Sequence, residues 1–143
     1  MLRLPRPGGL LPALEAAGRE SAILSPKTIL LLDDSNTMLL MEQVILGGGD
    51  YQLITTRDGE AAIRAALTHA PDLILLDTLL PRMDGLEVCR QLRGKDQTRG
   101  TPIILMTPRG GGREEFRSSA NDTVAKPIDG LELLGKIKNL LGD

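Results

Sequence analysis

Chemically active side chains stand directly after four short apolar runs of this 143-residue chain. The groups that follow these runs are acidic, hydroxyl or ammonium groups, on Asp33 with Asp34, Asp77, Thr107 and Lys126. If the runs are parallel β-strands, their carboxyl ends meet at one edge of a sheet, where open α/β sheets bind their ligands. The sequence therefore predicts one cleft that contains three carboxylates, one hydroxyl and one ammonium group.

The predicted set of carboxylates restricts the chemistry of this cleft. Carboxylates that crowd together repel one another, so at neutral pH they need a cation or shifted pKa values. Oxygen ligands without histidine or cysteine suit a hard ion such as Mg²⁺. A carboxylate can also act as a nucleophile toward a phosphoryl group, whose oxygens then need cationic and hydrogen-bonding partners. Mg²⁺, the Lys126 ammonium and the Thr107 hydroxyl could fill these places.

The segments between these residues predict a parallel sheet covered by helices. Apolar runs of about four residues alternate with longer stretches of helical period, which is typical of βαβ units. We expect strands at 29–32, 51–56, 73–76, 102–106 and 123–125. We expect helices at about 37–46, from an Asp58 cap through 69, about 86–92, about 113–119 and from 129 onward, with Ser35 or Asn36 as the first N-cap. These elements fit one three-layer α/β/α domain.

Composition excludes several classes of function. Seventeen basic and 19 acidic side chains give a net charge of −2, which argues against direct nucleic-acid binding. One cysteine excludes an internal disulfide and a thiolate-based structural zinc site, and one histidine excludes sites that need several imidazoles. One Tyr, one Phe and no Trp exclude base-stacking platforms and aromatic cages. No stretch approaches the roughly 20 apolar residues of a membrane span.

The first 26 residues differ in texture from the rest of the chain. They are rich in Pro, Gly, Ala and Leu and show no sustained period, so we expect a flexible N-terminal extension at 1–26 before a domain at 27–143. Prolines and glycines interrupt the apolar stretch that a signal peptide would need. We therefore expect a cytoplasmic protein.

The ordered set of motifs resembles the receiver domains of bacterial two-component response regulators. Asp33-Asp34 is similar to the acidic pair of that family, and Asp77, in Leu-Leu-Asp-Thr-Leu-Leu-Pro-Arg-Met-Asp-Gly, is similar to its phosphoacceptor. Thr107 is similar to the Thr or Ser after strand four, and Lys126-Pro127 to a Lys-Pro pair usually joined by a cis peptide. The resemblance covers residues 28–142. It implies a flavodoxin-like fold with a five-stranded parallel sheet in the order 2-1-3-4-5.

The resemblance also implies a Mg²⁺ site. Asp34 and Asp77 would bind the ion directly, together with the backbone carbonyl of Leu79, and Asp33 would hold it through water.

The implied activity is phosphoryl acceptance, not turnover of an external substrate. Asp77 would take a phosphoryl group from a phosphohistidine of a sensor histidine kinase or phosphotransfer protein. Lys126 would pair with the phosphoryl group, and Thr107 would move to hydrogen-bond it. The implied output is altered binding to a downstream protein, with no direct role for nucleic acid or membrane, and a homodimer is compatible with the resemblance. The only catalysis implied is that of its own phosphorylation and slow dephosphorylation.

Three departures from the family pattern concern signal transmission. Thr123 stands where the family generally has an aromatic residue, so a ring cannot swing there with Thr107. Pro108 stands where Ala is common and stiffens the loop. The segment 107–126 is shorter than usual and contains Gly110-Gly111-Gly112, which predicts a short or irregular fourth helix.

By the same resemblance, two other positions bear on the lifetime of the phosphoryl group. Leu79 and Arg109 are not suited to position an attacking water, which predicts slow self-dephosphorylation.

Two alternative functions remain beside the receiver. A pseudo-receiver would be a docking module that works without phosphorylation, and Thr123 with the short fourth helix favours it. A phosphohydrolase of the haloacid dehalogenase type would need a second acid two residues after its nucleophile, where Leu79 stands.

Overall fold

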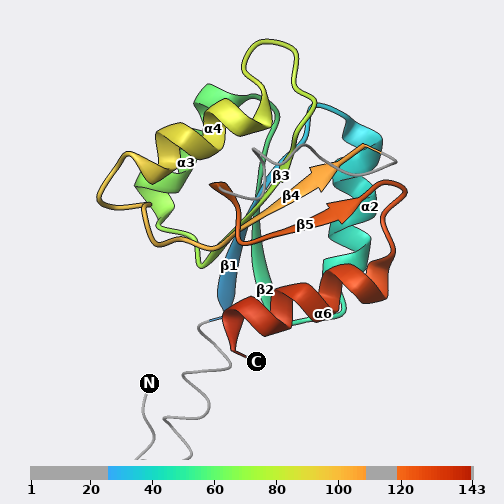
Figure 1. The fold of residues 1–143 in the computed structure, drawn as a ribbon. Helices are drawn as coiled ribbons and strands as arrows, with labels where there is room; N and C mark the ends of the chain where they lie inside the picture. Colours follow the sequence, from blue (N-terminus) through green and yellow to red (C-terminus); the bar gives the residue numbers. More distant parts are fainter. Residues whose placement is uncertain (1–25, 109–118, 143) are drawn as a thin grey trace, which may run out of the picture.

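Five parallel strands form the centre of the computed structural model, which describes residues 26–108 and 119–142. The strands are β1 (Lys27–Leu32), β2 (Tyr51–Thr56), β3 (Leu73–Asp77), β4 (Ile103–Thr107) and β5 (Asp122–Ala125). The described helices are α2 (Asn36–Leu46), α3 (Gly59–His69), α4 (Gly85–Arg93) and α6 (Gly130–Leu141). Helices α2 and α6 cover one face of the sheet, and α3 and α4 cover the other (Figure 1).

The strand order β2-β1-β3-β4-β5 confirms the predicted three-layer α/β/α architecture. All four pairings are parallel, so the carboxyl ends of the strands lie at one edge of the sheet. The predictions of an extension at 1–26 and of a short fourth helix at about 113–119 fall almost wholly outside the described residues. Within the described ranges, no helix combines the length and apolar character that a membrane span needs.

The three inner strands are buried on both faces, which explains why their sequences are nearly unbroken apolar runs. Successive side chains of a strand point to opposite faces. In β1, Leu30 and Leu32 therefore pack against α3 and α4, whereas Ile29 and Leu31 pack against α2 and α6. One half of the apolar core thus packs on each face of the sheet. The polar groups lie at the ends of the strands.

Each described helix begins at a side chain that caps its first turn. Ser35 accepts a hydrogen bond from the Met38 amide at 3.2 Å, which makes Ser35, and not Asn36, the N-cap of α2. The N-caps of the other three helices are Asp58, Asp84 and Asp129. Caps satisfy amides that have no partner within the helix. Because Ser35 follows β1 after only two residues, the capping also fixes the loop that carries the acidic pair.

Strand ends differ by one residue from the sequence prediction at several places. Strand β4 begins at Ile103 and not at Pro102, because proline has no amide to donate to a neighbouring strand. Both β3 and β4 extend one residue further, to include Asp77 and Thr107. Strand β5 begins one residue earlier, at Asp122. The polar residues at the ends of β3 and β4 thus belong to the sheet itself and inherit its geometry.

A single guanidinium ties α4 to the segment that enters β5. Arg93 donates hydrogen bonds to the carbonyls of Thr101 at 2.7 Å, Arg99 at 2.9 Å and Ser119 at 3.1 Å. It also donates to the Asn121 side-chain oxygen at 2.8 Å. These bonds hold the segment that enters β5 against the end of α4.

Candidate functional site

Three acidic side chains meet at the carboxyl edge of the sheet. Asp33 and Asp34 follow β1, and Asp77 ends β3, its neighbour in the sheet. Each offers a carboxylate oxygen, and these oxygens lie within 4.8 Å of one another. The three residues therefore form an acidic pocket that could hold a metal ion. The gathering of carboxylates predicted from strand order is present.

Asp77 lies almost fully buried in this pocket, with 3% of its surface exposed. Its Oδ1 atom is 3.1 Å from the Lys126 ammonium and also accepts the Leu79 amide at 3.1 Å. An ion pair with one partner this deeply buried depends on both members, because removing one leaves an uncompensated charge. Lys126, which follows β5 and precedes a cis peptide to Pro127, is thus part of the same site.

The two members of the acidic pair differ in exposure. Asp33 is completely buried, and its Oδ1 atom accepts the Ser35 amide at 3.0 Å. Burial raises the pKa of Asp33, and the bond from the Ser35 amide opposes this rise. Asp34 is exposed, and its backbone carbonyl accepts a hydrogen bond from Arg57 at 2.8 Å. Asp33 thus lies inside the pocket and Asp34 at its mouth.

Thr107 lies at the same strand edge but its hydroxyl points elsewhere. It is buried, and its Oγ1 donates to the Val124 carbonyl of β5 at 3.4 Å. The Thr107 carbonyl in turn accepts the Lys126 amide at 2.8 Å. Thr107 therefore holds β4 against β5 and would have to rotate to reach a group bound at Asp77.

Leu79 brings its backbone, and not its side chain, to the acidic pocket. Its amide donates a hydrogen bond to Asp77, whereas the residue as a whole is 61% exposed. Arg109, the other residue expected to affect the lifetime of a phosphoryl group, lies outside the described residues.

Gly85 lets α4 start directly against the end of β3. A Cβ atom there would lie 2.6 Å from the Asp77 carbonyl oxygen and 2.7 Å from the Thr78 Cα atom. Real Cβ atoms do not approach backbone this closely, so any side chain would push β3 and α4 apart. The Gly85 amide instead donates to the Thr78 carbonyl at 3.1 Å. The backbone on either side of Asp77 therefore depends on this glycine.

Known proteins with similar sequences and structures identify the family to which this site belongs. A model of the response regulator receiver domain family matches residues 29–138. The chain belongs to this family. The receiver domain is 38% identical, over 121 residues, to the alkaline phosphatase synthesis transcriptional regulatory protein PhoP of Bacillus subtilis (strain 168). The match covers 80% of this chain and 48% of PhoP, so the chain spans about half the length of that relative.

A second relative has nearly the same length as the matched region. The polar-differentiation response regulator DivK of Brucella anthropi is 33% identical over 121 residues, which cover 82% of this chain and 98% of DivK. A solved structure, the receiver domain of the sensor histidine kinase PA1611 of Pseudomonas aeruginosa PAO1, superimposes with a TM-score of 0.76. It is 30% identical and covers 82% of this chain and 99% of its own, and it was crystallised with a magnesium ion in its active-site cleft. The resemblance to receiver domains is confirmed.

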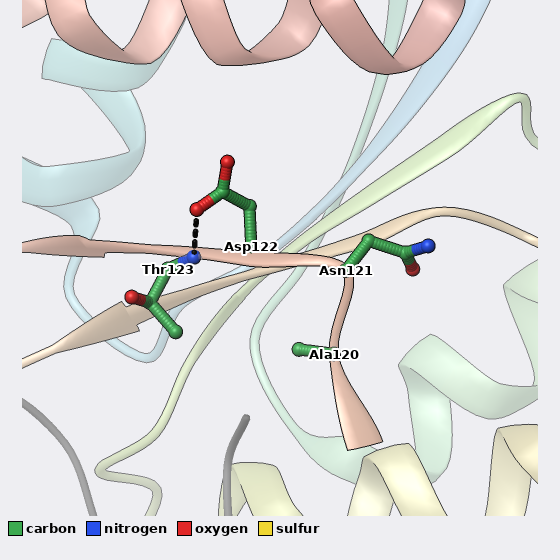
Figure 2. A pocket seen from close by; sticks show the side chains of 4 residues that line it. All are labelled: Ala120, Asn121, Asp122 and Thr123. Atoms are coloured by element: carbon green, nitrogen blue, oxygen red, sulfur yellow. Dashed lines mark hydrogen bonds between the residues drawn. The ribbon is translucent and has the colours of Figure 1, made fainter. Parts of the chain in front are cut away.

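Thr123 is a small polar side chain on β5 of the receiver domain. Together with Ala120, Asn121 and Asp122, it lines a pocket of about 370 Å³ (Figure 2). The Thr123 amide donates to the Asp122 side chain at 2.8 Å. The sequence has no aromatic residue at this position, and small side chains line the pocket beside Thr123.

Glu42 is a site neighbour that sequence reasoning missed. It lies on α2, is completely buried, and shares the apolar face of that helix with Leu39 and Leu46. Burial, followed by the nearby Asp33 carboxylate, raises the pKa of Glu42 to about 9. The spacing of three and four residues from two apolar neighbours was the available signal, because it places an acid on a face that packs on the sheet.

The raised pKa of Glu42 predicts a stability that falls with rising pH. The folded receiver keeps this proton up to about pH 9, whereas the unfolded chain releases it near its ordinary value of 4.5. The contribution is therefore complete below pH 4.5 and is lost as the pH rises toward the folded pKa. Between pH 5 and pH 8, we expect wild type to lose about 3–4 kcal/mol of unfolding free energy relative to Glu42→Gln.

Urea unfolding of both proteins across this pH range measures the difference. The glutamine side chain of the variant has the same shape as glutamate and carries no titratable proton, so its curve should lack the Glu42 contribution. Parallel curves for wild type and Glu42→Gln would contradict the prediction.

Proposed function

We propose that this receiver domain accepts a phosphoryl group on Asp77, with Mg²⁺, from a phosphohistidine of a sensor kinase or phosphotransfer protein. Phosphorylation then switches its binding to a downstream protein. The observation that carries the proposal is the buried Asp77 carboxylate, with an ammonium 3.1 Å from one oxygen and two further carboxylates beside it. Each of these groups has a role in phosphoryl transfer, and a structural role alone does not require all of them.

The donor set fits a hard divalent cation. The side chains that form the pocket offer carboxylate oxygens as ligand atoms. One of these, the buried Oδ2 atom of Asp33, accepts no hydrogen bond from the described residues. Asp34 and Asp77 would bind Mg²⁺ directly with the Leu79 carbonyl, and Asp33 through water. When bound, Mg²⁺ neutralises negative charge on the carboxylates and on the transferring phosphoryl group. PA1611, whose receiver domain holds magnesium in its cleft, supports this assignment.

The transfer step needs little from the protein beyond position and charge. A carboxylate oxygen of Asp77 attacks the phosphorus, the new O–P bond forms, and the P–N bond of the phosphohistidine breaks. The electron pair of that bond returns to the imidazole nitrogen, so no oxidant or reductant takes part. The Lys126 ammonium lies close enough to Asp77 to pair with a phosphoryl oxygen. The Thr107 hydroxyl, once it leaves the Val124 carbonyl, donates to another.

The proposed output is a change in protein binding and not turnover of an external substrate. The receiver promotes its own phosphorylation and loses the phosphoryl group slowly, because the Leu79 side chain offers no polar group to position water.

Uptake of phosphate from a small phosphodonor tests the proposal. We expect intact-mass measurement of the full chain to show one added phosphoryl group when Mg²⁺ and the donor are present. Chelation of Mg²⁺ should prevent the addition. A chain that binds Mg²⁺ and yet gains no phosphoryl group would overturn the proposal in favour of a docking module that works without phosphorylation.

A further inference from the structure

Asp34 has fewer bonding partners than the other two carboxylates of the acidic pocket. Asp77 accepts the Leu79 amide at 3.1 Å. Asp33 accepts the Ser35 amide at 3.0 Å. Asp34 is exposed, and within the described part of the chain no donor bonds its carboxylate. The position of this carboxylate therefore depends on the backbone that carries it.

The backbone at Asp34 is held by a hydrogen bond that comes from the end of β2. Arg57 Nη2 donates to the Asp34 carbonyl at 2.8 Å, and in the described ranges Asp34 forms no other hydrogen bond. A guanidinium donates from a planar fork of fixed geometry, so it restricts the direction of the carbonyl as well as its distance. The bond therefore orients the short stretch of backbone from which the Asp34 side chain projects.

The backbone of Arg57 is itself fixed on both sides. Strands β1 and β2 pair with Leu32 opposite Thr56, so Arg57 follows β2 at the level where the acidic pair follows β1. The Thr56 carbonyl accepts the Asp33 amide at 3.1 Å, which joins the two strand ends. On the other side of Arg57, Asp58 caps the first turn of α3. The arginine side chain thus crosses from one fixed strand end to the loop of its neighbour.

We propose that Arg57 is a positioning residue for the cation site, which fixes the loop that carries Asp34 by a hydrogen bond to its backbone. This inference rests on the proposed function, because it takes Asp34 as a direct ligand of Mg²⁺. Groups that orient metal ligands typically change metal affinity by about 10–100-fold when they are removed. The bond between Asp33 and Thr56 also holds the loop, so we expect the low end of that range.

Charge and position predict opposite effects of removing the Arg57 guanidinium. A guanidinium close to the acidic pocket repels a divalent cation, so by charge alone its loss would strengthen Mg²⁺ binding. Loss of the hydrogen bond instead frees the backbone at Asp34, so by position the same substitution weakens Mg²⁺ binding. The direction of the change therefore decides whether Arg57 acts through its hydrogen bond.

Three variants of the full chain separate these effects. Arg57→Met removes the donor and the charge, whereas Arg57→Lys keeps a charged donor on a side chain of similar length. Arg64→Met is the matched control, since Arg64 is exposed on α3 and its loss changes the net charge equally. Calorimetric titration with Mg²⁺ at a single pH and ionic strength should show about tenfold weaker binding for Arg57→Met. The other two variants should stay within about threefold of wild type.

A second measurement reports the hydrogen bond without any metal. The ¹³C chemical shift of the Asp34 carbonyl should change in metal-free Arg57→Met, because this carbonyl loses a charged donor at 2.8 Å. The same shift should keep its wild-type value in Arg64→Met. Because Arg57 is exposed, its replacement creates no cavity and the variant remains folded for this comparison.

The outcomes separate this inference from the proposed function. Unchanged or tighter Mg²⁺ binding by Arg57→Met overturns the positioning role, and so does equal weakening in either of the other two variants. An unchanged carbonyl shift of Asp34 in Arg57→Met overturns it as well. These results leave the proposed function standing, because wild type still binds Mg²⁺. A wild-type chain that binds no Mg²⁺ overturns both, and one that binds Mg²⁺ without accepting a phosphoryl group overturns the proposed function alone.

Discussion

Replacing Asp77 by Asn is expected to lower phosphoryl uptake from a small donor by at least about 100-fold. The amide oxygen carries no full negative charge and is a poor nucleophile toward phosphorus. The asparagine side chain can still accept the Leu79 amide, so the turn after β3 has no reason to unfold. Intact mass of both proteins, incubated with Mg²⁺ and donor for the same time, measures the loss.

Asp84→Asn is the matched control for this substitution. Asp84 is the next carboxylate along the chain, and its side chain caps α4 by accepting the Glu87 amide at 2.8 Å. Asparagine caps helices about as well as aspartate, so the fold should persist and uptake should remain. Unchanged uptake in Asp77→Asn would mean that another residue is the acceptor, and cleavage mapping of the labelled protein would then identify it.

Gly85→Ala is expected to reduce the free energy of unfolding by about 3–5 kcal/mol. The added Cβ would meet the Asp77 carbonyl oxygen at 2.6 Å and the Thr78 Cα atom at 2.7 Å. Both are backbone atoms and cannot rotate away. Relief therefore requires β3 and α4 to separate, which would also displace Asp77 from Lys126. Phosphoryl uptake should fall together with stability.

The control for the glycine substitution is Gly135→Ala on α6. A Cβ atom at Gly135 would have no heavy atom within 4 Å, so alanine fits and favours the helix. We expect a gain of about 0.5–1 kcal/mol there. Urea unfolding of both variants gives the comparison, and equal stability of Gly85→Ala and wild type would contradict the close approach.

The strand ends were the most predictable part of this molecule. A strand buried on both faces is apolar along its length, so the first polar residue after it marks the carboxyl edge. That rule located Asp33, Asp77 and Thr107 before any fold was known. Parallel pairing of β1 with β3 then brings the first two together. Capping side chains set the helix starts to within one residue for the same local reason, since Ser35 and Asp58 accept amides of the turn that they open.

Contacts between elements were not predictable in the same way. The bond from Thr107 to Val124 depends on a side-chain rotation that no local pattern specifies. Glu42 was passed over because an acid within a helix usually faces solvent. Its spacing from Leu39 and Leu46 places it on the apolar face of α2, but its position next to Asp33 follows only once α2 packs on the sheet. The hydrogen bonds of Arg93 join segments up to 28 residues apart in sequence. The periodicity of a helix or strand says nothing about contacts at that separation.

The sheet divides the apolar interior into two halves whose buried side chains belong to separate clusters. Substitutions that touch no common neighbour combine additively in their effect on stability. Substitutions in the cluster under α3 and α4 should therefore change the free energy of unfolding independently of substitutions in the cluster under α2 and α6. The polar strand ends lack this independence, since Asp77 and Lys126 form one ion pair and the members of an ion pair couple. The two faces of this sheet can thus be substituted separately, whereas the residues at its carboxyl edge have to be changed together.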